Sequence, residues 1–305
     1  MAKQLSLVLD SPLLGKVKND RNLMVWNFFS LTRDRVDALP VFEDQALGVR
    51  IEVRAKGTGV ATIWDKQILI YIASIIQDKL AHGETVSQKF TFTAHDYFRV
   101  CRVSPGGSSY DVLEGALERL QGTQIKTNIE TGGEGEEGAF SWISSYKVQY
   151  RRDKVTGDKV MKAVTLEVCD WFYRAVMKDQ RLLTYNPDYF GLAPLERRLY
   201  EVARAHCGDQ AGFRINIAKL QKRVGSDTEL KKFKLFLMKL QAKRNALPDY
   251  YIALGHKAGM FRIDGPNPRV PLKSIMVLFG RKDRLQDLTW ASAPIADNDD
   301  EVEAA

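Results

Sequence analysis

The spacing of apolar residues along the first half of the chain predicts a helix followed by a defined series of strands and helices. Ile68, Ile72 and Ile75 recur at helical spacing, in a broad apolar stripe that ends near Gly83. Beyond it, short β-rich runs alternate with helical patterns and with turns that carry glycine, proline and serine. The predicted elements are a strand at Phe90–Thr93, a helix at Ala94–Val103, a turn at Ser104–Ser109, a helix at Tyr110–Gln121, and strands at Phe140–Tyr150 and Val160–Val168.

The same order of elements returns in the second half of the chain. Its first helix begins at Pro194, because proline is tolerated at the first helical position. The predicted elements are helices at Pro194–Arg204, Ile217–Val224 and Glu229–Arg244, a turn at Gly225–Thr228, and strands at Phe213–Asn216, Tyr250–Leu254 and Met260–Ile263. Two helices joined by a short turn, preceded by a strand and closed by a β-hairpin, make the winged form of the helix-turn-helix. The sequence therefore predicts an α+β protein with two tandem winged-helix domains.

These two copies divide the 305 residues into four parts, and this length suits two domains. We expect an N-terminal extension over residues 1–40, the first winged-helix domain over residues 41–180 and the second over residues 181–265. Residues 266–305 are expected to form a C-terminal tail, whose acidic end is predicted to be disordered.

The charge balance indicates a polyanionic partner. The net charge is +7 with a pI near 9.2, and the acidic run Asp297–Glu301 makes the rest of the chain more basic than this total. Three widely spaced cysteines suit a reducing compartment, and neither a signal peptide nor a membrane-length apolar run is present. We therefore expect a cytoplasmic protein that has no membrane partner.

The helix predicted over Glu229–Arg244 carries the strongest electrostatic signal. Phe233, Leu237 and Leu240, with Phe236, share a face that should pack on the domain core, and the lysines lie mostly on the other faces. A lone helix of this kind would simply present a solvated basic face, but the first residues of a recognition helix reach base edges in the major groove. The residues predicted to contact double-stranded DNA here are Lys222, Arg223, Ser226, Asp227, Thr228, Lys231, Lys232, Lys234 and Lys239.

The corresponding helix in the first copy has the opposite charge. Asp111, Glu114 and Glu118 face only one cation, Arg119, which favours protein contacts over phosphate contacts. The hairpin loop of this copy is basic, and its predicted contacts to the DNA backbone are Arg151, Arg152 and Lys154. A charged loop that contacts only solvent fits this loop equally well.

Catalytic signatures are nearly absent from the sequence. The chain has no phosphate-binding Gly-x-x-x-x-Gly-Lys-Ser/Thr loop, and its four histidines form no metal-binding pair. The segment Gly133–Gly138 matches Gly-x-Gly-x-x-Gly, but its glutamates would repel a pyrophosphate and a strand follows it. We interpret that segment as a flexible loop, and we expect a protein without catalytic residues, metal or cofactor.

Four ordered blocks of the sequence resemble one known family. The blocks Gly59–Tyr71, Leu120–Ile129, Leu195–Arg204 and Leu247–Tyr250 are similar to the replication initiator protein A family of proteobacterial plasmids and phages. The resemblance implies a non-enzymatic initiator that binds specific origin DNA, often at repeated sites, promotes origin opening and recruits host replication factors. It also implies a homodimer formed through the first winged-helix domain.

Two alternatives remain open at this point. A winged-helix transcriptional repressor would bind an operator with the same fold. A relaxase that nicks DNA through a tyrosine to start rolling-circle replication is disfavoured, because the chain lacks the paired histidines of a metal-dependent nicking site.

Overall fold

The protein folds into two compact units. The computed structural model describes residues 9–152, 154–155, 157, 159–243, 245–256, 271–292 and 301–303. Unit 1 comprises the described residues up to Asp20 together with Phe28–Tyr185, and unit 2 comprises Arg21–Asn27 and the described residues from Asn186 onward. The chain therefore passes between the units three times.

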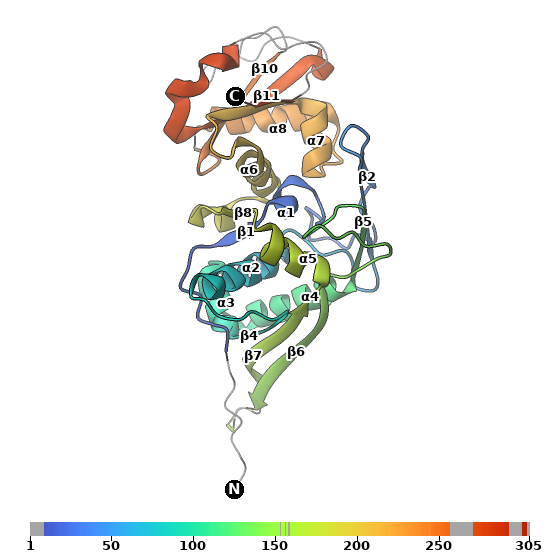
Figure 1. The fold of residues 1–305 in the computed structure, drawn as a ribbon, viewed down its shortest axis with the longest axis vertical. Coiled ribbons are helices and arrows are strands. Elements are labelled where there is room, and N and C mark those ends of the chain that lie inside the picture. The colour runs from blue at the N-terminus through green and yellow to red at the C-terminus, as the bar shows by residue number, and fades with distance from the viewer. Residues whose placement is uncertain are drawn as a thin grey trace. The chain divides into compact units, whose positions relative to one another are not determined.

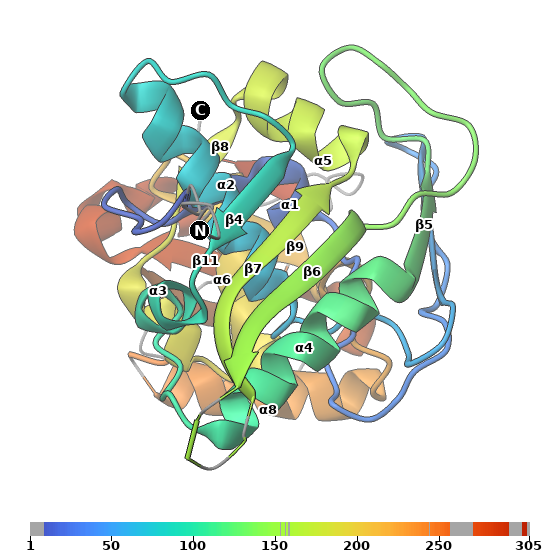
Figure 2. The ribbon, with the colours of Figure 1, turned by 90° about the horizontal axis from the view of Figure 1, so that it is seen from below.

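Unit 1 contains the first copy of the predicted order of elements. In sequence these are α2 (Lys66–Ala81), β4 (Lys89–Phe92), α3 (Ala94–Val100), α4 (Gly107–Gly122), β6 (Ile143–Arg152) and β7 (Lys159–Val168). The three strands form an antiparallel sheet in the order β4-β7-β6, and the long β6–β7 hairpin lies beside α4 (Figure 2).

Additional elements of unit 1 surround this arrangement. They are β1 (Lys18–Asp20), β2 (Phe42–Asp44), β3 (Val49–Ala55), β5 (Thr123–Thr127), α5 (Asp170–Arg174), the π-helix η1 (Ala175–Asp179) and β8 (Leu182–Thr184). Strands β2, β3 and β5 make a second sheet, and β1 pairs with β8. The core is centred on α2, whose residues 66–76 are all buried, and on an aromatic cluster in which Trp142 contacts Phe28, Phe29 and Trp171.

Unit 2 contains the second copy. Its elements are α1 (Arg21–Val25), the 3-10 helix η2 (Pro187–Gly191), α6 (Pro194–Cys207), β9 (Gly212–Asn216), α7 (Ile217–Val224), α8 (Leu230–Ala242), β10 (Tyr250–His256), the 3-10 helix η3 (Leu272–Ser274), β11 (Ile275–Arg281), the 3-10 segment η4 (Lys282–Ser292) and β12 (Glu301–Glu303). The sheet order is β10-β11-β9-β12, and Figure 1 shows β10 beside β11. Leu285 and Leu288 of η4 pack with Ala211, Met276 and Leu278 in a small cluster.

The two copies agree in strand pairing as well as in element order. In each, the first strand pairs with the third and not with the second, so that β4 pairs with β7 and β9 pairs with β11. The second and third strands form an antiparallel pair in both units. The repeated order predicted from the sequence is therefore present, and the protein is a mixed α+β structure with several small sheets.

Two expectations about the ends of the chain need correction. Residues 1–40 are not a separate extension, because β1 belongs to unit 1 and α1 belongs to unit 2, where Leu23, Met24 and Val25 are buried. The predicted boundary after residue 180 lies close to the observed one after Tyr185.

The predicted C-terminal tail contains a central strand. The sequence placed the partner of the Tyr250–Leu254 strand at Met260–Ile263, which lies outside the described residues. Among the described residues, β10 pairs with β11. The residues Ile275–Phe279 of β11 are all buried, so they belong to the core of unit 2 and not to a tail. The acidic end, expected to be disordered, contains β12, which pairs with β9.

A buried arginine joins α1, α6 and α7 within unit 2. The guanidinium of Arg198 is 1% exposed and donates to Glu201 Oε2 (2.5 Å), to the Met24 carbonyl (3.0 Å) and to the Arg223 carbonyl (3.2 Å). The hydroxyl of Tyr189 donates to the other oxygen of Glu201 (2.8 Å). Because every partner is buried, none can turn to water if the guanidinium is removed.

We predict that Arg198→Ala lowers the free energy of unfolding of unit 2 by about 3–5 kcal/mol, because it leaves the Glu201 carboxylate buried and unpaired. Urea unfolding of the full chain measures this change. Arg35→Ala is the control, since the Arg35–Asp37 ion pair is 66% and 73% exposed and such pairs contribute little. A wild-type unfolding midpoint for Arg198→Ala would contradict the structural role assigned to this guanidinium.

Candidate nucleic-acid interface

The turn between α7 and α8 is largely exposed, and a few close contacts define its course. Gly225 ends α7 with a φ of +74°, and the Ser226 amide donates to the Gln221 carbonyl (3.1 Å). A Cβ on Gly225 would lie 1.9 Å from the side-chain nitrogen of Asn27, so this position accepts only glycine without rearrangement. The hydroxyls of Ser226 and Thr228 lie 2.9 Å apart. The direction in which α8 leaves α7 is therefore set by local contacts.

The burial pattern of α8 agrees with the predicted core face. Phe233, Leu237 and Leu240 are buried and Phe236 is half-buried. Most of the cations predicted to bind DNA are accessible to a ligand; Lys222, Lys231, Lys232 and Lys239 are exposed and Lys234 is half-buried. Asp227 and Thr228 in the turn are also exposed, and Ser226 is half-buried. The segment from α7 through α8 thus brings these predicted residues to one continuous stretch of unit 2.

Arg223 does not belong to this interface. Its side chain is 1% exposed, its guanidinium lies 5.5 Å from the Trp26 ring centroid, and Nη1 lies 3.1 Å from His206 Nε2. The helical spacing explains the burial, because Arg223 follows the buried Leu220 by three residues and so falls on the core face of α7. The predicted phosphate contact by Arg223 is therefore corrected to a structural role.

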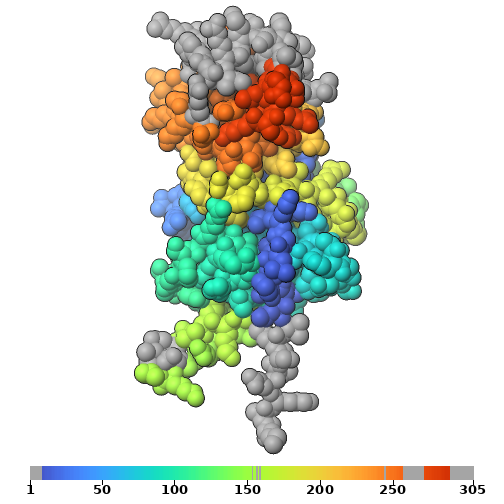
Figure 3. Space-filling view, turned by 90° about the vertical axis from the view of Figure 1, so that its left-hand side faces the viewer, coloured from blue at the N-terminus to red at the C-terminus, as the bar shows by residue number. Residues whose placement is uncertain are grey.

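The basic hairpin of unit 1 is exposed. Arg151, Arg152 and Lys154 lie at the end of the β6–β7 hairpin and are all exposed. Lys159 Nζ lies 4.8 Å from the Tyr150 ring centroid. The hairpin protrudes from the body of unit 1 (Figure 3). These cations belong to unit 1, whereas the lysines of α8 belong to unit 2, so the predicted site residues form two groups.

Helix α4 presents acids where α8 presents lysines. The buried residues of α4, Leu113, Leu117 and Leu120, match Phe233, Leu237 and Leu240 of α8 in spacing. With these faces matched, Asp111 corresponds to Lys231 and Glu114 to Lys234. At these two positions the helices therefore carry opposite charges.

The cation of α4 is already paired, which leaves the helix surface acidic. Arg119 Nε lies 2.7 Å from Asp65 Oδ2, and that carboxylate is 2% exposed. Burial raises the pKa of Tyr146 on β6, and the carboxylates of Glu118 and Glu114 raise it further.

The glycine-rich loop expected to be flexible is held by ion pairs. Lys178 Nζ lies 2.5 Å from Glu134 Oε1, and Arg174 contacts both Glu134 and Glu136. The amide of Gly132 donates to Asp179 (2.8 Å). These contacts connect the loop to α5 and η1 of unit 1.

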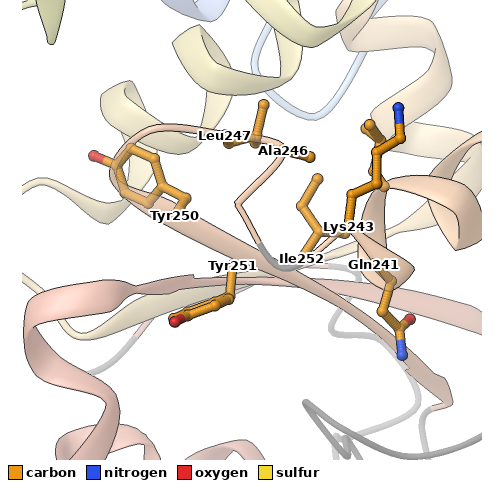
Figure 4. A pocket seen from close by; sticks show the side chains of 8 residues that line it. Gln241, Lys243, Ala246, Leu247, Tyr250, Tyr251 and Ile252 are labelled. Carbon is orange, nitrogen blue, oxygen red and sulfur yellow. The ribbon is translucent and has the colours of Figure 1, made fainter. Parts of the chain in front are cut away.

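A shallow hollow at the C-terminal end of α8 contains a single charged side chain, Lys243. Its lining residues are Leu240, Gln241, Lys243, Ala246, Leu247, Tyr250, Tyr251 and Ile252 (Figure 4). Tyr250 and Tyr251 point to opposite sides of β10. The lining therefore holds no pair of acidic and basic groups for proton transfer.

Neither a metal centre nor a membrane span is found in the described part of the chain. No group of three or more His, Cys, Asp or Glu residues there could hold a metal ion. None of the helices described there is long and apolar enough to span a membrane.

The fold and the exposed lysines define a basic α+β protein of two repeated units, one of which presents a lysine-rich helix. A family model for "Replication initiator protein A" matches residues 18–252, and the chain belongs to this family. The resemblance seen in the four sequence blocks is thereby confirmed.

Comparisons with individual proteins agree with this membership. A protein of Wigglesworthia glossinidia brevipalpis named "Putative replication protein" is 36% identical over 207 residues, which are 67% of this chain and 74% of that protein. A crystal structure of domains 2 and 3 of RctB has a TM-score of 0.56 and 12% identity, over 84% of this chain and 95% of that one. A second structure of the same RctB domains has a TM-score of 0.51. At 12% identity the likeness to RctB concerns the fold alone.

We predict that Gly225→Ala destabilises unit 2 by more than the roughly 1 kcal/mol expected for alanine at positive φ, because the new Cβ meets Asn27. Gly83→Ala is the matched control, since Gly83 has a φ of +73° and open space around its missing side chain. Urea unfolding measures both. Adding Asn27→Ala should remove the excess cost at Gly225, and equal costs for the two glycine variants would refute the close contact.

Proposed function

We propose that this protein is a non-enzymatic replication initiator that binds specific sites in origin DNA through α8. The observation that carries the proposal is the exposed lysine face of α8, set against the acidic face of α4 at matching positions. Membership of the replication initiator protein A family supports the step from DNA binding to initiation.

We infer further that each unit is a winged helix. In support, α3 with α4 and α7 with α8 are each two helices joined by a turn, and each pair is followed by two antiparallel strands. A helix-turn-helix closed by such a hairpin is a winged helix, and its second helix enters the major groove. On this basis α8 is the recognition helix of unit 2.

In the proposed docking, residues at the start of α8 contact bases and the exposed lysines contact phosphates. Thr228 and Asp227 precede α8, where the first residues of a recognition helix meet base edges. The exposed Lys231, Lys232 and Lys239 bind phosphates, which supply affinity, and the few base contacts set the register.

The hairpin of unit 1 supplies a second DNA contact. Its exposed cations Arg151, Arg152 and Lys154 bind the backbone of an adjacent stretch of duplex. Binding at repeated sites through both units would bend the DNA, at a cost of about 1–6 kcal/mol for a smooth bend, and strain of this kind promotes opening nearby.

Unit 1 is the proposed surface for protein partners. The exposed acids Asp111, Glu114 and Glu118 repel phosphate, so α4 suits a partner protein better than DNA. We propose that unit 1 mediates a homodimer and recruits host replication proteins. Sedimentation of the purified chain tests the dimer, and a monomer at micromolar concentration would count against it.

We predict that the double variant Lys231→Ala, Lys232→Ala weakens DNA binding and reduces the slope of log affinity against log salt. The expected reduction is about 0.9 for each phosphate that the variant no longer neutralises. Fluorescence anisotropy with a labelled origin duplex measures the slope. The control is Asp111→Ala with Glu114→Ala on α4, which should leave the slope unchanged. An unchanged slope for the lysine variant would place the DNA interface elsewhere.

A replication assay separates an initiator from its alternatives. We predict that the gene and its flanking DNA sustain a marker plasmid that lacks any other origin, and that the Lys231→Ala, Lys232→Ala variant does not. A repressor would protect the same DNA in a footprint without sustaining the plasmid. A relaxase would nick supercoiled DNA in the presence of a divalent metal, an outcome that would overturn the non-enzymatic assignment.

A further inference from the structure

One exposed apolar residue interrupts the lysine face of α8. Leu235 is 49% exposed although it lies in the middle of a 13-residue helix. Single exposed leucines are common on protein surfaces, so exposure alone has no functional meaning. The position of Leu235 on the helix and the charges around it give the exposure its significance.

Leu235 points directly away from the core of unit 2. At about 100° per residue, it lies ~160° around the helix from both Phe233 and Leu237, which are buried. It therefore occupies the centre of the exposed face. A side chain at this position projects farthest from the core and would be the first to reach the floor of a groove into which α8 docks.

Lysines lie on both sides of Leu235. Lys231 is displaced by ~40° in one direction, and Lys239 and Lys232 by ~40° and ~60° in the other. The two sides of α8 thus carry cations toward the two walls of a major groove, which is about as wide as a helix, at ~12 Å. Leu235 is left facing the base edges between those walls.

The combination of lysines and one leucine on this face favours DNA over an apolar protein surface as its ligand. An apolar protein surface would have to bury the flanking lysines without counter-ions, whereas DNA supplies a phosphate for each of them. In the major groove the 5-methyl of thymine is the apolar group that a base pair presents. In α4 the position that corresponds to Leu235 is Gly115, and the exposed apolar residue of that helix, Val112, lies at the position of Lys232.

We propose that Leu235 is a specificity-determining residue that contacts the 5-methyl group of a thymine in the bound site. This inference rests on the proposed docking of α8 in the major groove. The contact gives α8 a preference for a T·A pair at one position of the site. The lysines bind phosphates and therefore do not distinguish between sequences.

Replacing thymine by deoxyuridine tests the contact, because this change removes the methyl group and keeps the base pairing. The full chain first selects its tightest duplexes from a pool of randomised sequence, and each thymine of the selected duplex is then replaced singly. We expect one substitution to weaken binding about fourfold, which corresponds to ~0.8 kcal/mol for one methyl group. Leu235→Ala should bind the thymine and deoxyuridine duplexes equally, and Leu235→Met should keep the preference.

A control variant keeps the contact distinct from general DNA binding. Lys231→Ala should weaken binding to both duplexes and leave their affinity ratio unchanged. Failure to select any duplex would refute the proposed function itself. Selection of a site without a thymine, equal affinities of the wild type for all duplexes, or discrimination retained by Leu235→Ala would overturn the role of Leu235 and leave DNA binding by α8 intact.

Discussion

The buried guanidinium of Arg198 is the interaction on which unit 2 depends. It stands where three chain segments meet, and it donates to main-chain carbonyls of α1 and to the last turn of α7, as well as to the Glu201 carboxylate. A buried charge is tolerated only when its hydrogen-bonding capacity is largely met, so these carbonyls must be in place for α6 to pack. The hydrogen bonds that satisfy the buried Arg198 guanidinium therefore also hold α7 and the turn that leads into α8.

The N-terminal segment Arg21–Asn27 takes part in this arrangement even though it is far from α7 in sequence. Arg21 donates to the Ala205 carbonyl (3.0 Å), Trp26 lies beneath the Arg223 guanidinium, and Asn27 fills the space beside Gly225. Arg223, which the sequence placed on DNA, is one of the groups that this segment covers. The exposed cations of α8 thus follow a turn in which Gly225 lies against Asn27.

The two units use one arrangement of helices and strands for different surfaces. Helices α4 and α8 each bury an apolar stripe beside an antiparallel sheet, which has three strands in unit 1 and four in unit 2, and this leaves the opposite face free for any charge. In α8 that face carries lysines, and in α4 it carries Asp111, Glu114 and Glu118. Packing therefore constrains one side of each helix and leaves the charge of the other side to surface residues, so that one fold presents two different surfaces.

The sequence by itself determined the order of elements in both units, the core face of α8 and the contrast in charge between α8 and α4. These features follow from local periodicity and side-chain chemistry, which a single helix or strand expresses without its neighbours. Tertiary structure alone decided the partner of β10, the allocation of Arg21–Asn27 to unit 2 and the burial of Arg223. Each of these depends on which distant segments meet. A strand can pair with any suitable strand, so local sequence does not select its partner. An arginine is buried only where groups from distant segments contact its guanidinium, as Trp26 and His206 do for Arg223.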